Sequence, residues 1–322
     1  MRRLLSLLAK AAVSALLLYL SLRRVDLTSV SQRMSGVDPR WIAFVLIVLS
    51  FQTCMNALRW RDIVTVCGAK LPAARALRYS FIGQFFSQVL PSTVGGDAAR
   101  IWLLARGGAG WPTAIYSVLI DRVVGVSVLA TLVVACLPWT LNLIQDPIAR
   151  VALAVIGFGA LGATLIFLTL GARQLRVLER WWLTRHLASA SRLAWRLCRS
   201  AAGARVTVIS FGIHFATVLA AWGVAKAAHA SIEFVQALFL ILPVVLVATV
   251  PVSIAGWGVR ESAMILAFSY AGLAESDGLI VSLLFGFAAL GIGAVGGIVW
   301  IASGYRWQTV KKIAADSRAH ER

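Results

Sequence analysis

The sequence has 322 residues, of which 60% are hydrophobic and only 14% are charged, and its mean hydropathy is +0.83. This composition lies outside the usual balance of a soluble globular chain and predicts an all-α polytopic membrane protein. The net charge of +18 would suggest nucleic-acid binding in a soluble domain, but here the Lys and Arg residues fall between apolar runs. In that position they orient membrane spans and meet anionic headgroups, so the composition argues against a nucleic-acid partner.

A helix needs about 20 apolar residues to cross the hydrocarbon core of a bilayer. Full spans are therefore expected over residues 4–22, 41–58, 112–137, 149–170, 206–226 and 279–302. The first run follows Arg2 and Arg3 like a signal peptide, but no small-residue cleavage site comes after it, so we expect it to remain as a span. The four cysteines form neither a CxxC pair nor a metal-ligand spacing, and we expect no metal or cofactor.

Two further apolar stretches, 76–106 and 234–272, are broken in the middle by the same motif. Pro91–Arg100 and Pro251–Arg260 both read Pro, any residue, Ser or Thr, Val or Ile, a small residue, Gly, three others and Arg. Proline removes a backbone donor and glycine weakens a helix, so each motif marks an unwound point. The flanking halves are short for a crossing, which predicts two re-entrant helical hairpins.

The distribution of charge predicts the orientation. Loops rich in Lys and Arg face the cytoplasm, which places both termini there, together with the segment 173–205 and the tail 303–322. The loops expected outside hold Asp146, Glu233, Glu275 and Asp277, whereas the arginine-containing loop 23–40 departs from the rule. With this topology the two hairpins enter from opposite sides. The halves 1–170 and 206–302 then form an inverted repeat in a single transmembrane domain, 1–322. We expect this domain to lie in a bacterial inner membrane.

The segment 173–205 carries eight arginines against one acid, Glu179. Helical spacing places apolar side chains on one face and arginines on the opposite face, which predicts an interfacial helix lying on anionic lipid headgroups. A solvated cytoplasmic loop is the alternative. The apolar face is formed by Leu183, Leu187, Ala190, Ala194 and Leu197, and the opposite one by Arg185, Arg192 and Arg199.

The repeated break predicts an anion site. Where a helix restarts inside the membrane, its first amide donors lack partners and its positive dipole end faces the break, so a phosphate can be held there. Small residues let a headgroup approach the backbone, and Arg100 and Arg260 would add positive charge. Asp97 could cap the restarted helix, and Glu261 could pair with an arginine or carry a proton. The small residues are Gly95, Gly96, Gly256 and Gly258.

Other polar residues are predicted to join this site. Asp121 and Arg122 lie near the middle of the run 112–137, where ionisable side chains are costly and indicate function. Adjacent helical residues point about 100° apart, so Asp121 could face Arg100 or Arg260 while Arg122 reaches an anionic ligand. Gln84 and Arg59 lie on polar stripes of their helices. Helix–helix hydrogen bonding would equally explain Gln84, and orientation at a membrane boundary would explain Arg59.

In order and spacing, four motifs resemble the transmembrane region of lysylphosphatidylglycerol synthetases and the stand-alone flippase-like proteins related to it. They are Leu58–Arg61, Pro91–Arg100, Asp121–Arg122 and Pro251–Glu261. The resemblance covers residues from about 40 to 302. It implies the flippase-like half only, because the chain ends at Arg322 with no room for the soluble synthetase domain. The resemblance does not identify which lipid is the substrate.

We therefore expect a lipid flippase that binds an anionic or zwitterionic headgroup, including aminoacylated or polyprenyl-linked lipids, at the two breaks. Arg100, Arg122 and Arg260 would neutralise phosphate, while Asp97, Asp121 and Glu261 would organise the arginines, bind an amine or carry protons. Two alternatives remain: an integral-membrane transferase acting on a lipid phosphate, and a membrane adaptor that docks partners through segment 173–205.

Overall fold

The computed structural model describes residues 36–90, 95–173, 182–249 and 258–304. Within these ranges the regular structure is entirely helical and contains no strand, which confirms the all-α prediction. The first expected span, 4–22, and residues 305–322 of the basic tail lie outside the described residues.

Five of the described helices are long and apolar enough to cross a membrane, and they coincide with five of the six expected spans. α3 starts at a well-formed cap, because the Asp38 side chain accepts a hydrogen bond from the Arg40 amide and Pro39 occupies the first turn. The five helices are α3 (Pro39–Val66), α6 (Trp111–Leu143), α7 (Pro147–Arg173), α9 (Ala201–Ala227) and α12 (Glu275–Ala302).

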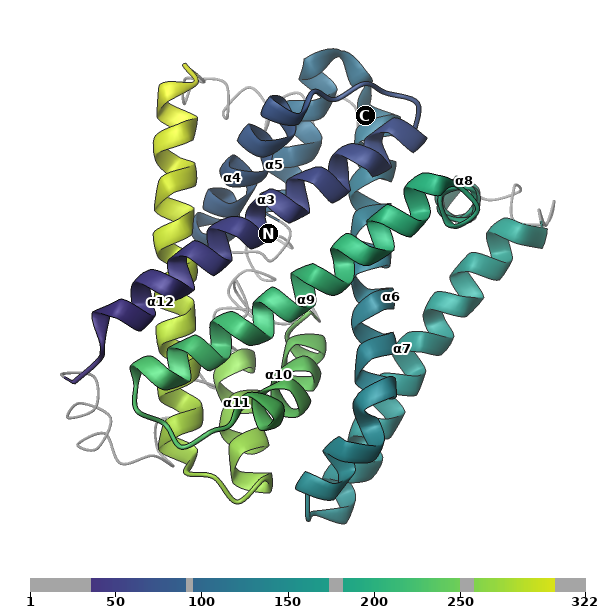
Figure 1. The fold of residues 1–322 in the computed structure, drawn as a ribbon. Coiled ribbons are helices and arrows are strands. Elements are labelled where there is room, and N and C mark those ends of the chain that lie inside the picture. Colours follow the sequence, from purple (N-terminus) through teal and green to yellow (C-terminus); the bar gives the residue numbers. More distant parts are fainter. Residues whose placement is uncertain (1–35, 91–94, 174–181, 250–257, 305–322) are drawn as a thin grey trace, which may run out of the picture.

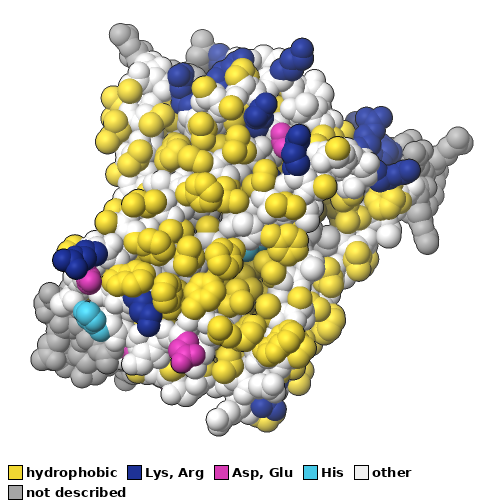
Figure 2. Space-filling view, viewed as in Figure 1, with side chains coloured by type: hydrophobic (Ala, Val, Ile, Leu, Met, Phe, Trp, Pro, Cys, Tyr) yellow, Lys and Arg dark blue, Asp and Glu magenta, His cyan; other side chains and the backbone are white. Residues whose placement is uncertain are grey.

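The exterior of the bundle is apolar over its middle. On α7 the side chain of Val155 is 65% exposed and that of Ile166 is 64% exposed, and on α12 Phe287 is 51% exposed. Figure 2 shows a broad apolar surface between ends that carry the charged side chains. Soluble monomers rarely expose apolar patches of such extent, so these side chains face lipid and the chain is a multi-pass membrane protein.

The two stretches that carry the repeated motif form two pairs of short helices, α4 (Ala73–Val89) with α5 (Gly95–Leu104), and α10 (Phe234–Ala248) with α11 (Val259–Tyr270). α4 and α5 run antiparallel, because Gly95 lies against Phe86 and Gly96 lies against Gly83. A short π-helix, η1 (Ala105–Ala109), follows α5. Figure 1 shows the α4–α5 pair toward one end of the bundle and the α10–α11 pair toward the other.

Glycines let the helices around the first pair approach closely. A Cβ atom on Gly296 of α12 would overlap the carbonyl oxygen of Phe81 on α4, and a Cβ on Gly96 would overlap that of Gly83. α4 is therefore held between α5 and α12 at backbone contact distance. This packing fixes the position of the hairpin end that begins at Gly95.

The predicted amphipathic segment forms α8 (Trp182–Cys198), so a loop is excluded for these residues. Its small apolar face is buried at Ala190 and Ala194. Ser191 on the same side donates to the carbonyl of Phe167 in α7. The helix is therefore docked on the protein along this face, and the expected contact of its arginines with anionic headgroups stays a prediction. Leu187, which was expected on that face, is 40% exposed.

Candidate functional site

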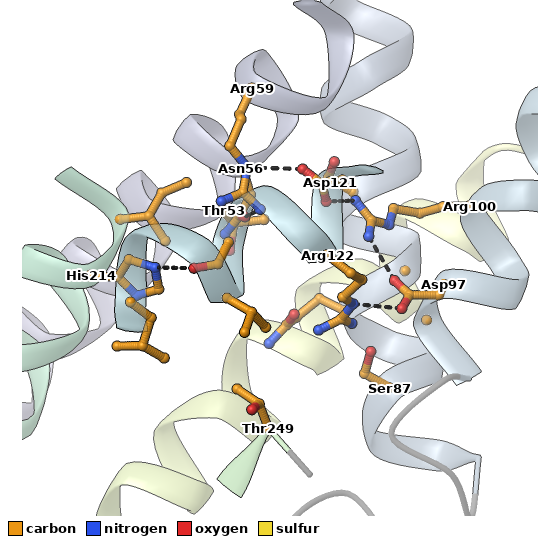
Figure 3. A pocket seen from close by; sticks show the side chains of 18 of the residues that line it. Thr53, Asn56, Arg59, Ser87, Asp97, Arg100, Asp121, Arg122, His214 and Thr249 are labelled. Carbon is orange, nitrogen blue, oxygen red and sulfur yellow. Dashed lines mark hydrogen bonds and ion pairs between the residues drawn. The ribbon is translucent and has the colours of Figure 1, made fainter. Parts of the chain in front are cut away.

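A cavity of about 390 Å³ lies inside the bundle, with walls from α3, α4, α5, α6, α9 and α10 (Figure 3). Gly96, the second residue of α5, and Thr249, the residue after α10, both line it. The described ends of the two breaks therefore converge on one space. Most of the residues that line it have polar or charged side chains: Thr53, Asn56, Arg59, Ser80, Gln84, Ser87, Asp97, Arg100, Asp121, Arg122, His214 and Thr249.

Five charged side chains in this wall form one continuous chain of ion pairs (Figure 3). Arg59 Nε donates to Asp121 Oδ1 at 2.8 Å, and Arg100 Nη1 donates to Asp121 Oδ2 at 3.0 Å. Arg100 Nη2 then donates to Asp97 Oδ1 at 2.6 Å, and Arg122 Nε donates to Asp97 Oδ2 at 2.6 Å. Charges thus alternate along the sequence Arg59, Asp121, Arg100, Asp97, Arg122, which we call the arginine–aspartate chain.

The buried arginines of this chain are well satisfied. Arg59 also donates to Ser210 Oγ at 3.3 Å and to Asn56 Oδ1 at 3.2 Å, so all three of its nitrogens are engaged. The guanidinium of Arg100 lies 5.1 Å from the centroid of the Trp60 ring, a cation–π distance. Buried charges are tolerated only when they are paired and hydrogen-bonded, and these contacts meet that condition.

Arg122 ends the chain at the open side of the cavity. Its side chain is 55% exposed, whereas those of Arg59, Asp97, Arg100 and Asp121 are between 3% and 10% exposed. Among the described residues Arg122 donates only through Nε, to Asp97. Its two terminal nitrogens are therefore available to an anion in the cavity, since a guanidinium carries five N–H donors.

Arg260 lies on the other side of Arg122. A second cavity of about 260 Å³ is lined by both arginines and shares Val245 and Thr249 with the first cavity. Arg260 Nη2 donates to Glu261 Oε1 at 2.8 Å. The remaining lining is mainly apolar and comes from α9 to α12: Thr217, Ala221, Ile241, Val244, Ala248, Met264 and Phe285.

Glu261 organises the start of α11. Its Oε2 accepts a hydrogen bond from the Gly258 amide at 2.6 Å, and its Oε1 accepts from Ser282 Oγ at 2.9 Å as well as from Arg260. The Glu261 side chain is fully buried. Its hydrogen bonds connect the start of α11 to Ser282 of α12, and its charge balances that of Arg260. Asp121, by contrast, pairs with Arg59 and Arg100.

A comparison with family models matches residues 7–297 to the Lysylphosphatidylglycerol synthase TM region. The match covers most of the chain. The chain belongs to this family. A comparison of the sequence with curated proteins finds no match.

The glycines predicted as site residues have different surroundings in this member of the lysylphosphatidylglycerol synthase transmembrane family. Gly96 lines the cavity, whereas Gly95 packs against Phe86 and Leu90 at the start of α5. Gly258 has φ +87°, a left-handed conformation that favours glycine. Its amide donates a hydrogen bond to the Glu261 carboxylate at the start of α11. Gly256 lies outside the described residues.

Several lining residues of this family member were not predicted as site residues. Gly83 and Gly125 line the cavity. His214 also lines it, and its Nε2 lies 3.0 Å from the carbonyl oxygen of Gly125. Ser80 has a buried hydroxyl with no hydrogen-bond partner among the described residues. Gly83 and Gln84 follow Ser80 by three and four residues, so helical periodicity on α4 could have indicated the face they share.

Proposed function

We propose that this protein moves a phospholipid or lipid-linked substrate between the leaflets of a bacterial inner membrane and binds its phosphate at Arg122. The observation that carries the proposal is the arginine–aspartate chain. It runs through the interior of an apolar helix bundle, and its exposed end lies in a cavity that residues beside both breaks line. Ionisable residues inside a membrane bundle commonly mark a substrate path.

Counting charges narrows the substrate. The chain contains three arginines and two aspartates, so its net charge is +1, and the neighbouring Arg260–Glu261 pair is neutral. One phosphodiester anion would balance this charge. Both aspartates already accept from two arginines, so a cationic amine would compete for an occupied carboxylate. We infer an anionic or zwitterionic phosphodiester headgroup, in preference to an aminoacylated lipid with net positive charge.

The second cavity suggests how the rest of the lipid is held. It adjoins the first at Arg122, Val245 and Thr249, and its other walls are mainly apolar. A phosphate between Arg122 and Arg260 could therefore extend its glycerol and the upper acyl chain along α9, α10 and α11. Polar headgroup contacts and apolar tail contacts then lie on either side of one arginine, as amphipathic ligands require.

The arrangement of the short helices is compatible with transport. We propose that the α4–α5 and α10–α11 pairs are re-entrant hairpins of an inverted repeat, entering from opposite sides toward one cavity. Transporters of this kind place the substrate at the repeat interface and open it alternately to each side. The end where α3 and α7 finish would face the cytoplasm, with the N- and C-termini on that side.

Flipping of fluorescent phosphatidylglycerol in reconstituted vesicles tests this function. We expect Arg122→Ala to lower the flipping rate at least about tenfold, the effect of losing about 1.4 kcal/mol of headgroup binding. Arg61→Ala is the matched control, because Arg61 belongs to the Leu58–Arg61 motif but is exposed and lines neither cavity. Equal rates for wild type and folded Arg122→Ala would contradict the proposal.

The charge argument has a separate readout in the same vesicles. Phosphatidylglycerol should compete with the fluorescent substrate more strongly than lysylphosphatidylglycerol, whose additional amines make it cationic. Stronger competition by the lysyl lipid would contradict the inferred substrate class while leaving transport itself intact. Lipid analysis of a deletion strain distinguishes the transferase alternative, since an enzyme changes lipid mass whereas a flippase changes only lipid sidedness.

A further inference from the structure

A third cavity lies away from the arginine–aspartate chain, at the outer ends of the first hairpin. Its volume is about 270 Å³, and it lies between the loop joining α3 to α4 and the π-helix η1. Its walls combine backbone from these two segments with a few side chains. The lining residues are Gly68, Ala69, Lys70, Leu71, Arg75, Tyr79, Leu104, Gly107, Gly108 and Ala109.

The charge in this cavity is entirely positive. Lys70 and Arg75 both line it, and its lining contains no acidic residue. Neither cation makes an ion pair or a side-chain hydrogen bond within the described part of the chain. Asp62, the acid nearest to this stretch in the sequence, pairs with Arg205 at 3.2 Å. Two uncompensated cations around one hollow indicate an anionic ligand.

The backbone around the hollow has an unusual shape that keeps it open. η1 is a π-helical turn, a feature frequent at functional sites, and Gly108 within it has φ +99°. A Cβ on Gly107 would lie 3.2 Å from Tyr79 Oη and 3.9 Å from Arg75 Nη1. A side chain at position 107 would therefore fill the space between the tyrosine and the arginine.

From these observations we propose that the hollow binds a phosphate group, through Lys70 and Arg75. Its exposed lining is almost wholly polar, so the ligand presents phosphate and hydroxyl groups there, with no acyl chain inside. The phosphate could belong to a lipid headgroup at the membrane surface or to a soluble phosphate compound. Because the hollow joins the residues just before α4 to those just after α5, occupation would clamp the outer ends of the hairpin whose inner end carries Asp97 and Arg100.

Hydrogen–deuterium exchange of the amides at 68–71 and 105–109 tests the site in two arms. In detergent, inorganic phosphate is titrated at constant ionic strength; in nanodiscs, phosphatidylcholine is compared with and without phosphatidylglycerol. We expect the wild type to be protected in at least one arm. Protection by inorganic phosphate alone assigns a soluble ligand, protection by phosphatidylglycerol alone assigns a headgroup, and protection in both assigns a general phosphate site.

The variant Lys70→Ala/Arg75→Ala should weaken this protection at least about tenfold. Arg61→Ala/Arg78→Ala is the matched control, because it removes the same charge from exposed residues that line no part of the hollow. Arg122→Ala should retain the protection, which separates this site from the transport cavity. The proposal is overturned by an unprotected wild type, by protection that survives Lys70→Ala/Arg75→Ala, or by equal loss in the control.

Discussion

At the scale of single residues, Asp121 joins the two buried arginines of the arginine–aspartate chain. One of its carboxylate oxygens accepts from Arg59 and the other from Arg100, and its side chain is 3% exposed. Arg122, the next residue along α6, points to the other end of the chain and is 55% exposed. Neighbouring residues on one helix therefore have different surroundings: Asp121 pairs with two buried arginines, and Arg122 is exposed and lines the cavity.

Asp121→Asn should destabilise the protein strongly. The substitution leaves Arg59 buried without an acidic partner and Arg100 with Asp97 alone, and losing one partner of a buried pair costs about 3–5 kcal/mol. Thermal unfolding in detergent measures the effect as a large fall in Tm. A Tm equal to that of the wild type would show that the inner chain is not the stabilising unit described above.

Arg122→Ala should leave stability within about 1 kcal/mol of wild type, since exposed ion pairs contribute little. Asp97 keeps its pair with Arg100 in this variant, so no buried charge is left alone. The same unfolding assay provides the contrast with Asp121→Asn. A similar fall in Tm for both variants would assign Arg122 a structural position within the chain.

At the scale of elements, backbone contact between helices determines the geometry of the first hairpin. Gly96 allows α5 to lie directly on Gly83 and Ser87 of α4, and Gly296 allows α12 to lie on Phe81. α8 uses a similar device on α7, where Gly171 lies against Ser191. Glycine permits such close contact because it has no Cβ atom to hold the two helix backbones apart.

Gly96→Ala should separate α4 from α5 and cost about 1–3 kcal/mol through overpacking. The added methyl group would overlap the Gly83 carbonyl and the Ser87 hydroxyl, and the displaced α5 would move Asp97 and Arg100. Tm and flipping rate should both fall. Gly159→Ala on α7 is the control, because a Cβ there has no atom within 4 Å, and its properties should match wild type.

The arginines of α8 should affect lipid dependence without affecting the fold. Arg185, Arg196 and Arg199 are exposed, whereas Ala190 and Ala194 are buried against the protein. Replacing the three arginines by Gln should remove any stabilisation by anionic lipid in nanodiscs and leave Tm in neutral lipid unchanged. Loss of flipping in neutral lipid would instead show that these arginines take part in transport itself.

At the scale of the whole molecule, charge divides the two ends of the bundle. Among the described residues, the end where α3 and α7 finish carries one acid, Asp62. Its basic residues are Arg61, Lys70, Arg75, Arg78, Arg106, Arg185, Arg192, Arg196, Arg199 and Arg205. The opposite end holds the acids Asp38, Asp146, Glu233, Glu275 and Asp277. The positive-inside rule then predicts that the basic end faces the cytoplasm.

Cysteine labelling tests this orientation with two matched positions. In a variant without the four natural cysteines, Ala274→Cys should react with an impermeant maleimide on intact spheroplasts, because position 274 is exposed at the acidic end. Ala74→Cys, exposed at the basic end, should react only after the membrane is opened. The reverse pattern would show that the protein is inserted the other way.

Much of the fold follows from local signals in the sequence. Apolar runs of sufficient length predicted five of the spans, because every backbone group in lipid must be satisfied within a helix. The breaks at Pro91 and Pro251 predicted the ends of α4 and α10, since proline and glycine act on the adjacent turn. Prediction was less accurate for α8, because its periodicity identifies an apolar face but cannot say whether protein or lipid covers it.

The sequence by itself thus determined a helical membrane protein, its broken helices and many of the charged residues that line the candidate site, because length, hydropathy and backbone chemistry act locally. Only the tertiary structure decided which charges meet. Arg59 and Asp121 lie 62 positions apart, yet their side chains form an ion pair, and Asp121 joins Arg100 while Glu261 keeps Arg260. Which side chains become partners depends on how the helices pack, and that packing left Arg122 as the exposed end of the chain.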